Sequence, residues 1–320
     1  VLIILLVCIV GRYLNYPFFR IFVGLNYFRY PTAIPVITIY APVVLAVLLP
    51  FITEFIARFK EGVFNSCGKF GNCLLAFCLV WNLCFLWTSL SFKSVMHEQI
   101  EYDYFVRTSQ WNKIIEMAKA KTPDSPFTVV CLNLALSQTG QMPSQMFHYF
   151  QNGTEGLFQP MSKDCFTPIP TAEVFFKLGM INAAQEYVFE AQEAIPNFRK
   201  SARFTRRLAV TNLINGKYEV SAKYLRMLKK TLFYRSWAEE TEKLLYDEEK
   251  MNSHPVYGEA RKNTYDEDFL ISDREMDKML GLLLVKNKQN RMAYEYLMSY
   301  IILRRDLEHF YDYFQLGNKM

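Results

Sequence analysis

Several side chains in the second half of the sequence have the types and the spacing that suit carboxylate binding. Arg203 and Arg206 lie three residues apart, which places both on one face of a helix. An arginine side chain can hold a carboxylate through two parallel hydrogen bonds. These two arginines therefore predict a partner that carries an acidic or carboxylate-ended segment.

The register of two helical hairpins, set by glycine turns at Gly179 and Gly216, extends this pattern. The inward-facing positions of the two first helices are Glu173, Phe176, Lys177, Arg203, Arg206 and Val210. These positions predict a groove that binds a protein partner or a peptide. A second interpretation stays open, in which Arg203 and Arg206 are solvated residues that pair with neighbouring acids such as Glu173.

The residue types that most often catalyse reactions or bind metals form no motif in this sequence. The four histidines have no HExxH or paired spacing, at His97, His148, His254 and His309. Only Cys131 and Cys165 follow residue 92, and we expect buried, reduced thiols there. The acids at 266–268 lack a partner base or ligand spacing. We predict no catalytic, cofactor-binding or metal site.

The helices that must position these side chains follow a repeated pattern. Tetratricopeptide (TPR) repeats are helical hairpins with small residues where the helices cross and a glycine at the turn. Residues 171–198 and 208–228 fit this pattern best. Close helix crossings are expected at Gly179, Ala184, Ala191, Gly216 and Gly281.

The spacing of the expected turns supports a repeat. Turns at positions 109, 140, 179, 216 and 288 are separated by 31, 39, 37 and 72 residues. This predicts a unit of 34 to 37 residues, with one degenerate unit at 236–270 and a loop or insertion at 251–269. Helix starts are indicated by Ser125-Pro126 and by S-x-x-E boxes at Ser236 and Ser272.

The first 92 residues have the composition of a membrane region. Residues 33–53 and 71–92 contain no charged residue, and each is long enough to cross a hydrocarbon core of roughly 30 Å. We interpret residues 1–11 as part of a further span whose start is missing, with a signal-peptide core as the alternative. The predicted fold class is all-α, with transmembrane helices in domain 1–92 followed by a TPR-like α-solenoid in domain 93–320.

The charges of the chain are divided unevenly. Residues 1–92 hold six basic and two acidic residues, and the remainder holds 30 and 29. The nearly neutral second part lacks the basic stripe that nucleic-acid binding requires, so we expect no nucleic-acid partner. The basic excess lies beside the predicted spans, where it suits lipid headgroups. Its distribution over the loops favours a cytoplasmic position for the second part.

Four stretches of the sequence resemble a known family of proteins. They are QWNKIIEMAK (110–119), GMINAAQEYVFEAQEAIPNF (179–198), INGKYEVSAKYLRMLKKTLFYRSWAEE (214–240) and NKQNRMAYEYLMSYIILRRDLEHF (287–310). The chain is similar to an uncharacterised bacterial inner-membrane family that has many membrane helices followed by a TPR-like helical tail. The resemblance implies this architecture and an inner-membrane location, and it carries over no catalytic residue. The present chain departs from that family by lacking the upstream helices.

Two functions are compatible with these features. In the first, the chain is a membrane-anchored scaffold whose helical tail binds a protein partner or peptide beside the lipid bilayer. In the second, it is the C-terminal part of a polytopic membrane enzyme or transporter, such as a polyprenyl-linked glycosyltransferase or an O-antigen ligase, whose catalytic helices are missing. The sequence favours the scaffold because these residues contain no catalytic motif.

Overall fold

The computed structural model describes residues 94–195, 199–265 and 275–317, together with scattered positions before residue 94. The chain divides into two compact units, residues 1–94 and 95–320. The described residues form helices and no strand, so the all-α class is confirmed. The predicted segments 1–11, 33–53 and 71–92 lie outside the described residues, apart from the scattered positions. Within the described part of the chain, no helix combines the length and the apolar character needed to cross a membrane.

The second unit begins with three helices, α5 (Ser94–Arg107), α6 (Trp111–Ala120) and α7 (Pro126–Gln138). The Ser125 hydroxyl caps α7 by accepting a hydrogen bond from the Thr128 backbone N–H at 3.3 Å, and Pro126 occupies the first helical position. Proline suits this position because the N–H that it lacks would have no partner within the helix. The predicted start of this helix is confirmed.

Helix α7 runs through the core of the second unit. Eleven of its 13 residues are buried, so other elements cover it on every side. Its polar side chains are satisfied internally, since Asn133 donates to the carbonyl of Gly156 at 2.8 Å and Ser137 donates to Glu295 at 2.8 Å. Buried polar groups need such partners to offset their loss of water. One continuous apolar cluster extends around α7, from Tyr102 to Ile301.

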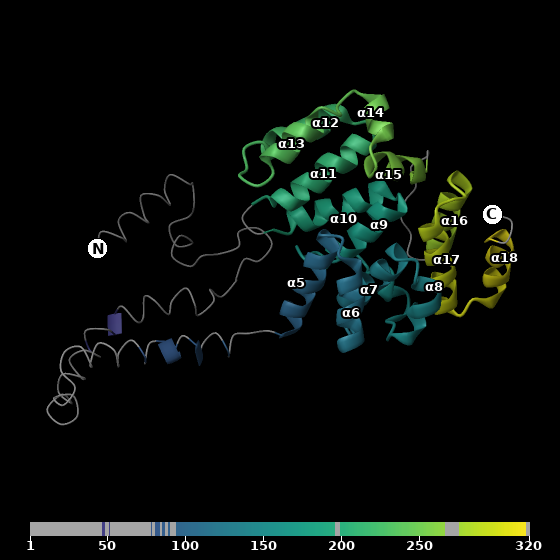
Figure 1. Ribbon diagram of the computed structural model, residues 1–320, viewed down its shortest axis with the longest axis horizontal. Helices are drawn as coiled ribbons and strands as arrows, with labels where there is room; N and C mark the ends of the chain where they lie inside the picture. The colour runs from purple at the N-terminus through teal and green to yellow at the C-terminus, as the bar shows by residue number, and fades with distance from the viewer. Residues whose placement is uncertain are drawn as a thin grey trace. The chain divides into compact units, whose positions relative to one another are not determined.

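Two helical hairpins follow, and they contain the predicted site residues. The first is α9 (Ile169–Leu178) with α10 (Ile181–Glu193), and the second is α11 (Ala202–Ile214) with α12 (Tyr218–Leu228). Helix α10 packs against α11, so the hairpins lie side by side (Figure 1). Both turns contain a glycine with positive φ, 96° at Gly179 and 69° at Gly216, a conformation that disfavours residues with a Cβ atom.

Three short helices follow the second hairpin, and the last two overlap the loop predicted at 251–269. They are α13 (Arg235–Glu242), α14 (Glu248–Ser253) and α15 (Tyr257–Asn263). The loop prediction is wrong for 257–263, where α15 packs against α9 and α11, because such contacts between distant segments leave no periodic pattern in the sequence. Residues 266–269 lie outside the described residues. The predicted capping box at Ser236 is also wrong, because α13 begins at Arg235 with no side-chain cap. Ser272 lies outside the described residues.

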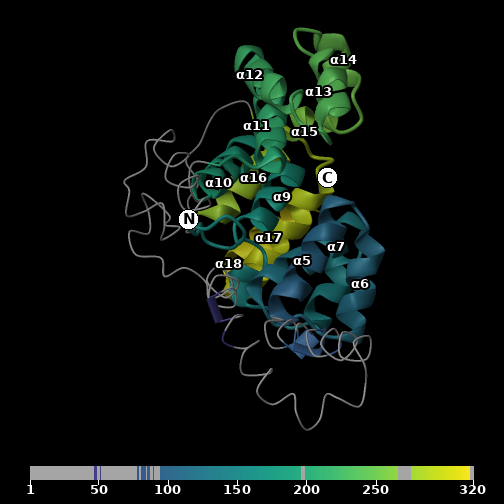
Figure 2. The same ribbon diagram turned by 90° about the vertical axis from the view of Figure 1, so that its left-hand side faces the viewer.

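The last three helices, α16 (Met276–Lys286), α17 (Arg291–Arg304) and α18 (Leu307–Gly317), return to the start of the unit. Helix α17 packs against α7, α8 (Met142–Gln145) and α9. Figures 1 and 2 both show α16 and α17 beside α9. Two 3-10 helices, η2 (Met146–His148) and η3 (Gly153–Gly156), complete the described elements.

The TPR-like solenoid is not confirmed. A turn lies at each of the five expected positions, 109, 140, 179, 216 and 288. However, the turn at Gly140 is followed by the four-residue helix α8 instead of a long second helix. Helix α17 also packs against α7, an element far earlier in the chain, which a stack of hairpins in strict sequence order would not bring together. A helix that is apolar on all sides, as α7 is, requires neighbours on all sides.

Candidate functional site

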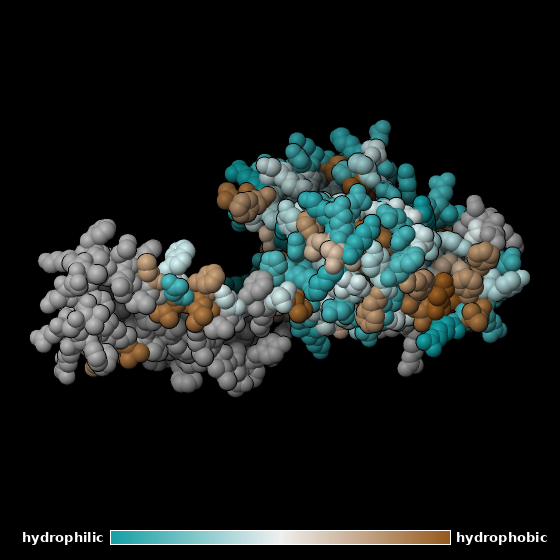
Figure 3. Space-filling model, turned by 60° about the horizontal axis from the view of Figure 1, so that its bottom comes forward, coloured by the Kyte–Doolittle hydropathy of each residue, from teal (hydrophilic) through white to brown (hydrophobic). Residues whose placement is uncertain are grey.

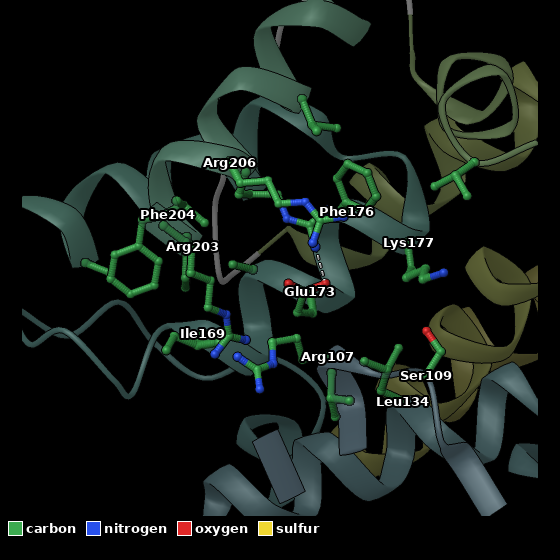
Figure 4. A pocket seen from close by; sticks show the side chains of 18 of the residues that line it. Arg107, Ser109, Leu134, Ile169, Glu173, Phe176, Lys177, Arg203, Phe204 and Arg206 are labelled. Atoms are coloured by element: carbon green, nitrogen blue, oxygen red, sulfur yellow. Dashed lines mark hydrogen bonds and ion pairs between the residues drawn. The ribbon is translucent and has the colours of Figure 1, made fainter. Parts of the chain in front are cut away.

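The candidate site is a pocket of about 410 Å³ in the second unit. Its walls come from α9 and α11, with contributions from α5, α10, α13 and the segment before α15. All six residues of the sequence-predicted site line it: Glu173, Phe176, Lys177, Arg203, Arg206 and Val210. Figure 4 shows the side chains of α9 and α11 together, with Arg107 of α5 below them.

The periodicity of two helices explains why these side chains share one pocket. Positions 173, 176 and 177 of α9 are three or four residues apart, as are 203, 206, 207 and 210 of α11. Residues at such intervals lie on one helix face. Residues from both of these faces line the same pocket.

Arg203 is already occupied by an acidic partner within the chain. Its two terminal nitrogens donate to the two carboxylate oxygens of Asp103 on α5, at 2.6 and 2.8 Å. Burial alone would lower the pKa of Arg203, but the hydrogen bonds and the charge of Asp103 raise it. For Arg203, the structure therefore agrees with the alternative interpretation, in which this arginine pairs with an acid of the same chain. The hydrogen-bonded acid is Asp103 and not Glu173. Arg203 is not free to bind a carboxylate of another molecule.

Glu173 forms the second internal ion pair, with Arg207. Burial raises the pKa of the Glu173 carboxyl, but the charges of Arg207 and Arg203 outweigh burial and lower the pKa below its usual value. The Arg207 guanidinium also lies over the ring of Phe176, 3.8 Å from its centroid. Sequence reasoning missed Arg207, although its spacing of four from Arg203 places it on the same helix face.

Three further cations of the pocket lack an acidic partner among the residues that the structure describes. Arg206 is exposed and lies over the ring of Trp237, 4.7 Å from the centroid. Lys177 lies 6.0 Å from the ring centroid of Trp111, and Arg107 is exposed at the end of α5. Contact with an aromatic face orients a cation without neutralising its charge. The pocket therefore offers uncompensated positive charge beside aromatic surfaces.

His254 lines the same pocket but is held as a neutral ring. Its ring stacks on Tyr257 with centroids 4.0 Å apart, and Nδ1 accepts the backbone N–H groups of Val256 and Tyr257, both at 3.2 Å. Burial lowers the pKa of His254. A nitrogen that accepts hydrogen bonds in this way is the unprotonated one. His254 thus shapes the wall of the pocket and adds no positive charge near neutral pH.

The described residues contain no group of three histidine, cysteine or acidic side chains able to hold a metal ion. Cys131 is buried, as expected, and burial raises the pKa of its thiol well above the usual value. Cys165, which we also expected to be buried, is exposed because the segment before α9 runs along the surface.

The side chain of Val210 is 4 % exposed and contributes an apolar part of the pocket wall.

These observations define a helical protein with a cationic, aromatic-walled pocket. The chain belongs to a family of unknown function, DUF6057, which matches residues 1–320. The comparison with curated proteins gives no match, and the comparison with solved structures gives none either. The site must therefore be interpreted from its own chemistry.

Proposed function

We propose that this chain is a membrane-anchored helical interaction protein whose pocket binds a short acidic segment of a partner protein. The observation that carries the proposal is the set of uncompensated cations, Arg107, Lys177 and Arg206, around one aromatic-walled pocket. An arginine held flat on an aromatic ring keeps its N–H groups available at the guanidinium edge. Arg206 is therefore the residue best placed to bind a carboxylate through two hydrogen bonds.

The two internal ion pairs give the pocket its shape. Arg203 with Asp103 connects α11 to α5, and Arg207 with Glu173 connects α11 to α9. Their charges are mostly cancelled internally, so they fix the walls, and the three other cations provide the attraction. A volume of about 410 Å³ suits a few side chains better than a whole helix. The expected occupant is a short acidic stretch or a C-terminal carboxylate.

The membrane anchor is also part of this proposal. It rests on the uncharged runs at 33–53 and 71–92, each of a length that suits a bilayer. The proposed location is the bacterial inner membrane, with the second unit on the cytoplasmic side. The alternative role, as the C-terminal part of a membrane enzyme or transporter, would assign the same pocket a regulatory or recruiting task.

Binding of a defined acidic peptide tests the proposed function. The full chain in lipid nanodiscs is titrated with a peptide of alternating Asp and Glu that has a free C-terminus, and binding is followed by tryptophan fluorescence, since Trp111 and Trp237 line the pocket. A peptide of alternating Asn and Gln with an amidated C-terminus is the matched control. We expect saturable binding of the acidic peptide only.

Two arginine variants locate the binding site in the same assay. Arg206→Gln should weaken binding about tenfold or more, because a hydrogen bond to a charged group contributes about 1.5–3 kcal/mol. Arg199→Gln removes an exposed arginine outside the pocket and should leave the affinity unchanged. Equal binding of the neutral peptide, or an Arg206→Gln variant that binds like the original chain, contradicts the proposal.

A further inference from the structure

The connection between α12 and α13 presents two large apolar side chains to solvent. Leu232 is 87 % exposed and Phe233 is 88 % exposed, and we call these two residues the apolar tip. Figure 3 shows a brown patch where α12 connects to α13, bordered by hydrophilic surface. Exposing a leucine and a phenylalanine side by side is unfavourable in water, and such surfaces mark contacts with a partner or a membrane.

The apolar tip is held outward by ordered structure on both sides. The Thr231 hydroxyl donates to the carbonyl of Leu228 at 2.7 Å and accepts the backbone N–H of Tyr234 at 3.3 Å. On the inner side, Leu228 packs with Leu225 and Ala238 in a small second apolar cluster. The turn therefore directs the apolar tip away from the nearest core.

Basic residues lie on both sides of the apolar tip in the sequence. Residues 220–238 contain five basic residues and no acidic residue. Lys229 and Arg235 form ion pairs with Glu242 and Glu239. The other three are exposed and have no acidic partner within the described ranges: Lys223, Arg226 and Lys230. The segment 220–238, which contains the apolar tip, therefore carries an excess of positive charge, and the acids Glu239, Glu240 and Glu242 follow it on α13.

We propose that this end of the second unit is a membrane-contact site, in which the apolar tip enters the surface of a bilayer containing anionic lipids. Apolar side chains next to lysine and arginine are the composition that binds the interface of such a bilayer, because the basic groups meet lipid phosphates while the apolar groups enter the acyl region. The surface area of two side chains on one turn is far smaller than the area of about 800 Å² per partner that a stable protein interface buries. The inference is independent of ligand binding in the pocket.

Quenching of an introduced tryptophan tests this contact in the full chain. Phe233→Trp is placed in nanodiscs whose lipids have brominated or ordinary acyl chains, with and without phosphatidylglycerol in phosphatidylcholine. The emission of the native tryptophans is subtracted with the unsubstituted chain. We expect the added emission to be lost with brominated chains when the anionic lipid is present, because bromine quenches only at close range.

Two further variants complete the test. Phe233→Trp combined with Lys223→Gln, Arg226→Gln and Lys230→Gln should lose most of the quenching. Val285→Trp reports from α16, where Val285 is 68 % exposed, and should remain unquenched. Full emission at position 233 in every lipid, or quenching that is equal with neutral and anionic lipids, overturns the proposal. So does a change in the emission at position 233 that appears only when another membrane protein is added, since that outcome assigns the apolar tip to a protein partner.

Discussion

Arg203 and Asp103 form an ion pair with two hydrogen bonds that joins α11 to α5 across one hundred residues of sequence. Their side chains are only 22 % and 12 % exposed. Removing one partner of such a pair leaves a poorly solvated charge, so Asp103→Ala should lower the free energy of unfolding by about 3 kcal/mol. Urea denaturation of the second unit, followed by circular dichroism, measures this change.

An exposed ion pair provides the matched control for Asp103. Arg235 and Glu239 are 70 % and 49 % exposed, and they lie four residues apart on α13. Glu239→Ala should therefore change the free energy of unfolding by less than about 1 kcal/mol. Equal effects of Asp103→Ala and Glu239→Ala would show that the Arg203 pair does not hold α5 and α11 together.

The two hairpin glycines should respond very differently to alanine. At Gly216, φ is 69° and, among the described residues beyond its chain neighbours, no atom lies within 4 Å of an added Cβ, so Gly216→Ala should cost only about 1 kcal/mol of strain. At Gly179, φ is 96° and the carbonyl oxygen of Asn263 would lie 2.6 Å from the Cβ. Gly179→Ala must also displace α15 and should cost more than about 3 kcal/mol. Thermal melts of both variants test this order, and similar melting temperatures would contradict it.

The Glu173 carboxylate should make the stability of the second unit depend on acid pH. Its pKa is lowered in the folded state, so its stabilising contribution is complete above the unfolded value near 4.5 and is lost as the pH falls through the folded pKa. Glu173→Gln removes this titrating group. The variant should be less stable at neutral pH and should lose less stability on acidification. Denaturation curves between about pH 7 and pH 3 measure both effects, and parallel pH profiles would exclude this role.

Asn290 connects the C-terminal helix pair to α9. Its side-chain nitrogen donates to the carbonyl of Leu178 at 3.0 Å, and its oxygen accepts the Ala293 backbone N–H at 3.1 Å as the cap of α17. Asn290→Ala removes both bonds at a buried position and should cost about 2 to 3 kcal/mol. Asp247→Ala removes an exposed helix cap, on α14, and should cost about 1 kcal/mol. If the two variants have the same melting temperature, the hydrogen bond between Asn290 and α9 contributes nothing to the free energy of unfolding.

The features that could be predicted from the sequence are those that depend on residues only a few positions apart. Glycine turns and the helical period placed Glu173 and Arg206 in one register, and the structure brings both into one pocket. The helix start at Ser125-Pro126 is equally local. Such features depend on backbone sterics and on side chains three or four residues apart, which the sequence displays directly.

The features that were missed depend on contacts between distant segments. Asp103 gives no local sign that it binds Arg203, and α15 is held by α9 and α11. Close crossings were also expected at Gly216 and Gly281, but among the residues that the structure describes an added Cβ at Gly281 would meet only Tyr313, at 3.7 Å. At Gly216 the glycine satisfies the backbone angle and no packing requirement. A one-dimensional pattern does not distinguish these two reasons for a glycine.

The return of α17 to α7 has a consequence for the synthesis of this protein. Ser137 of α7 finds its acceptor, Glu295, 158 residues later in the chain. On the ribosome, α7 is therefore made long before the helix that covers it, and folding domains that depend on such distant contacts is slow. A nascent chain that ends before α16 would leave apolar surface of α7 and α9 uncovered, which makes it a substrate for chaperones until the last helices emerge.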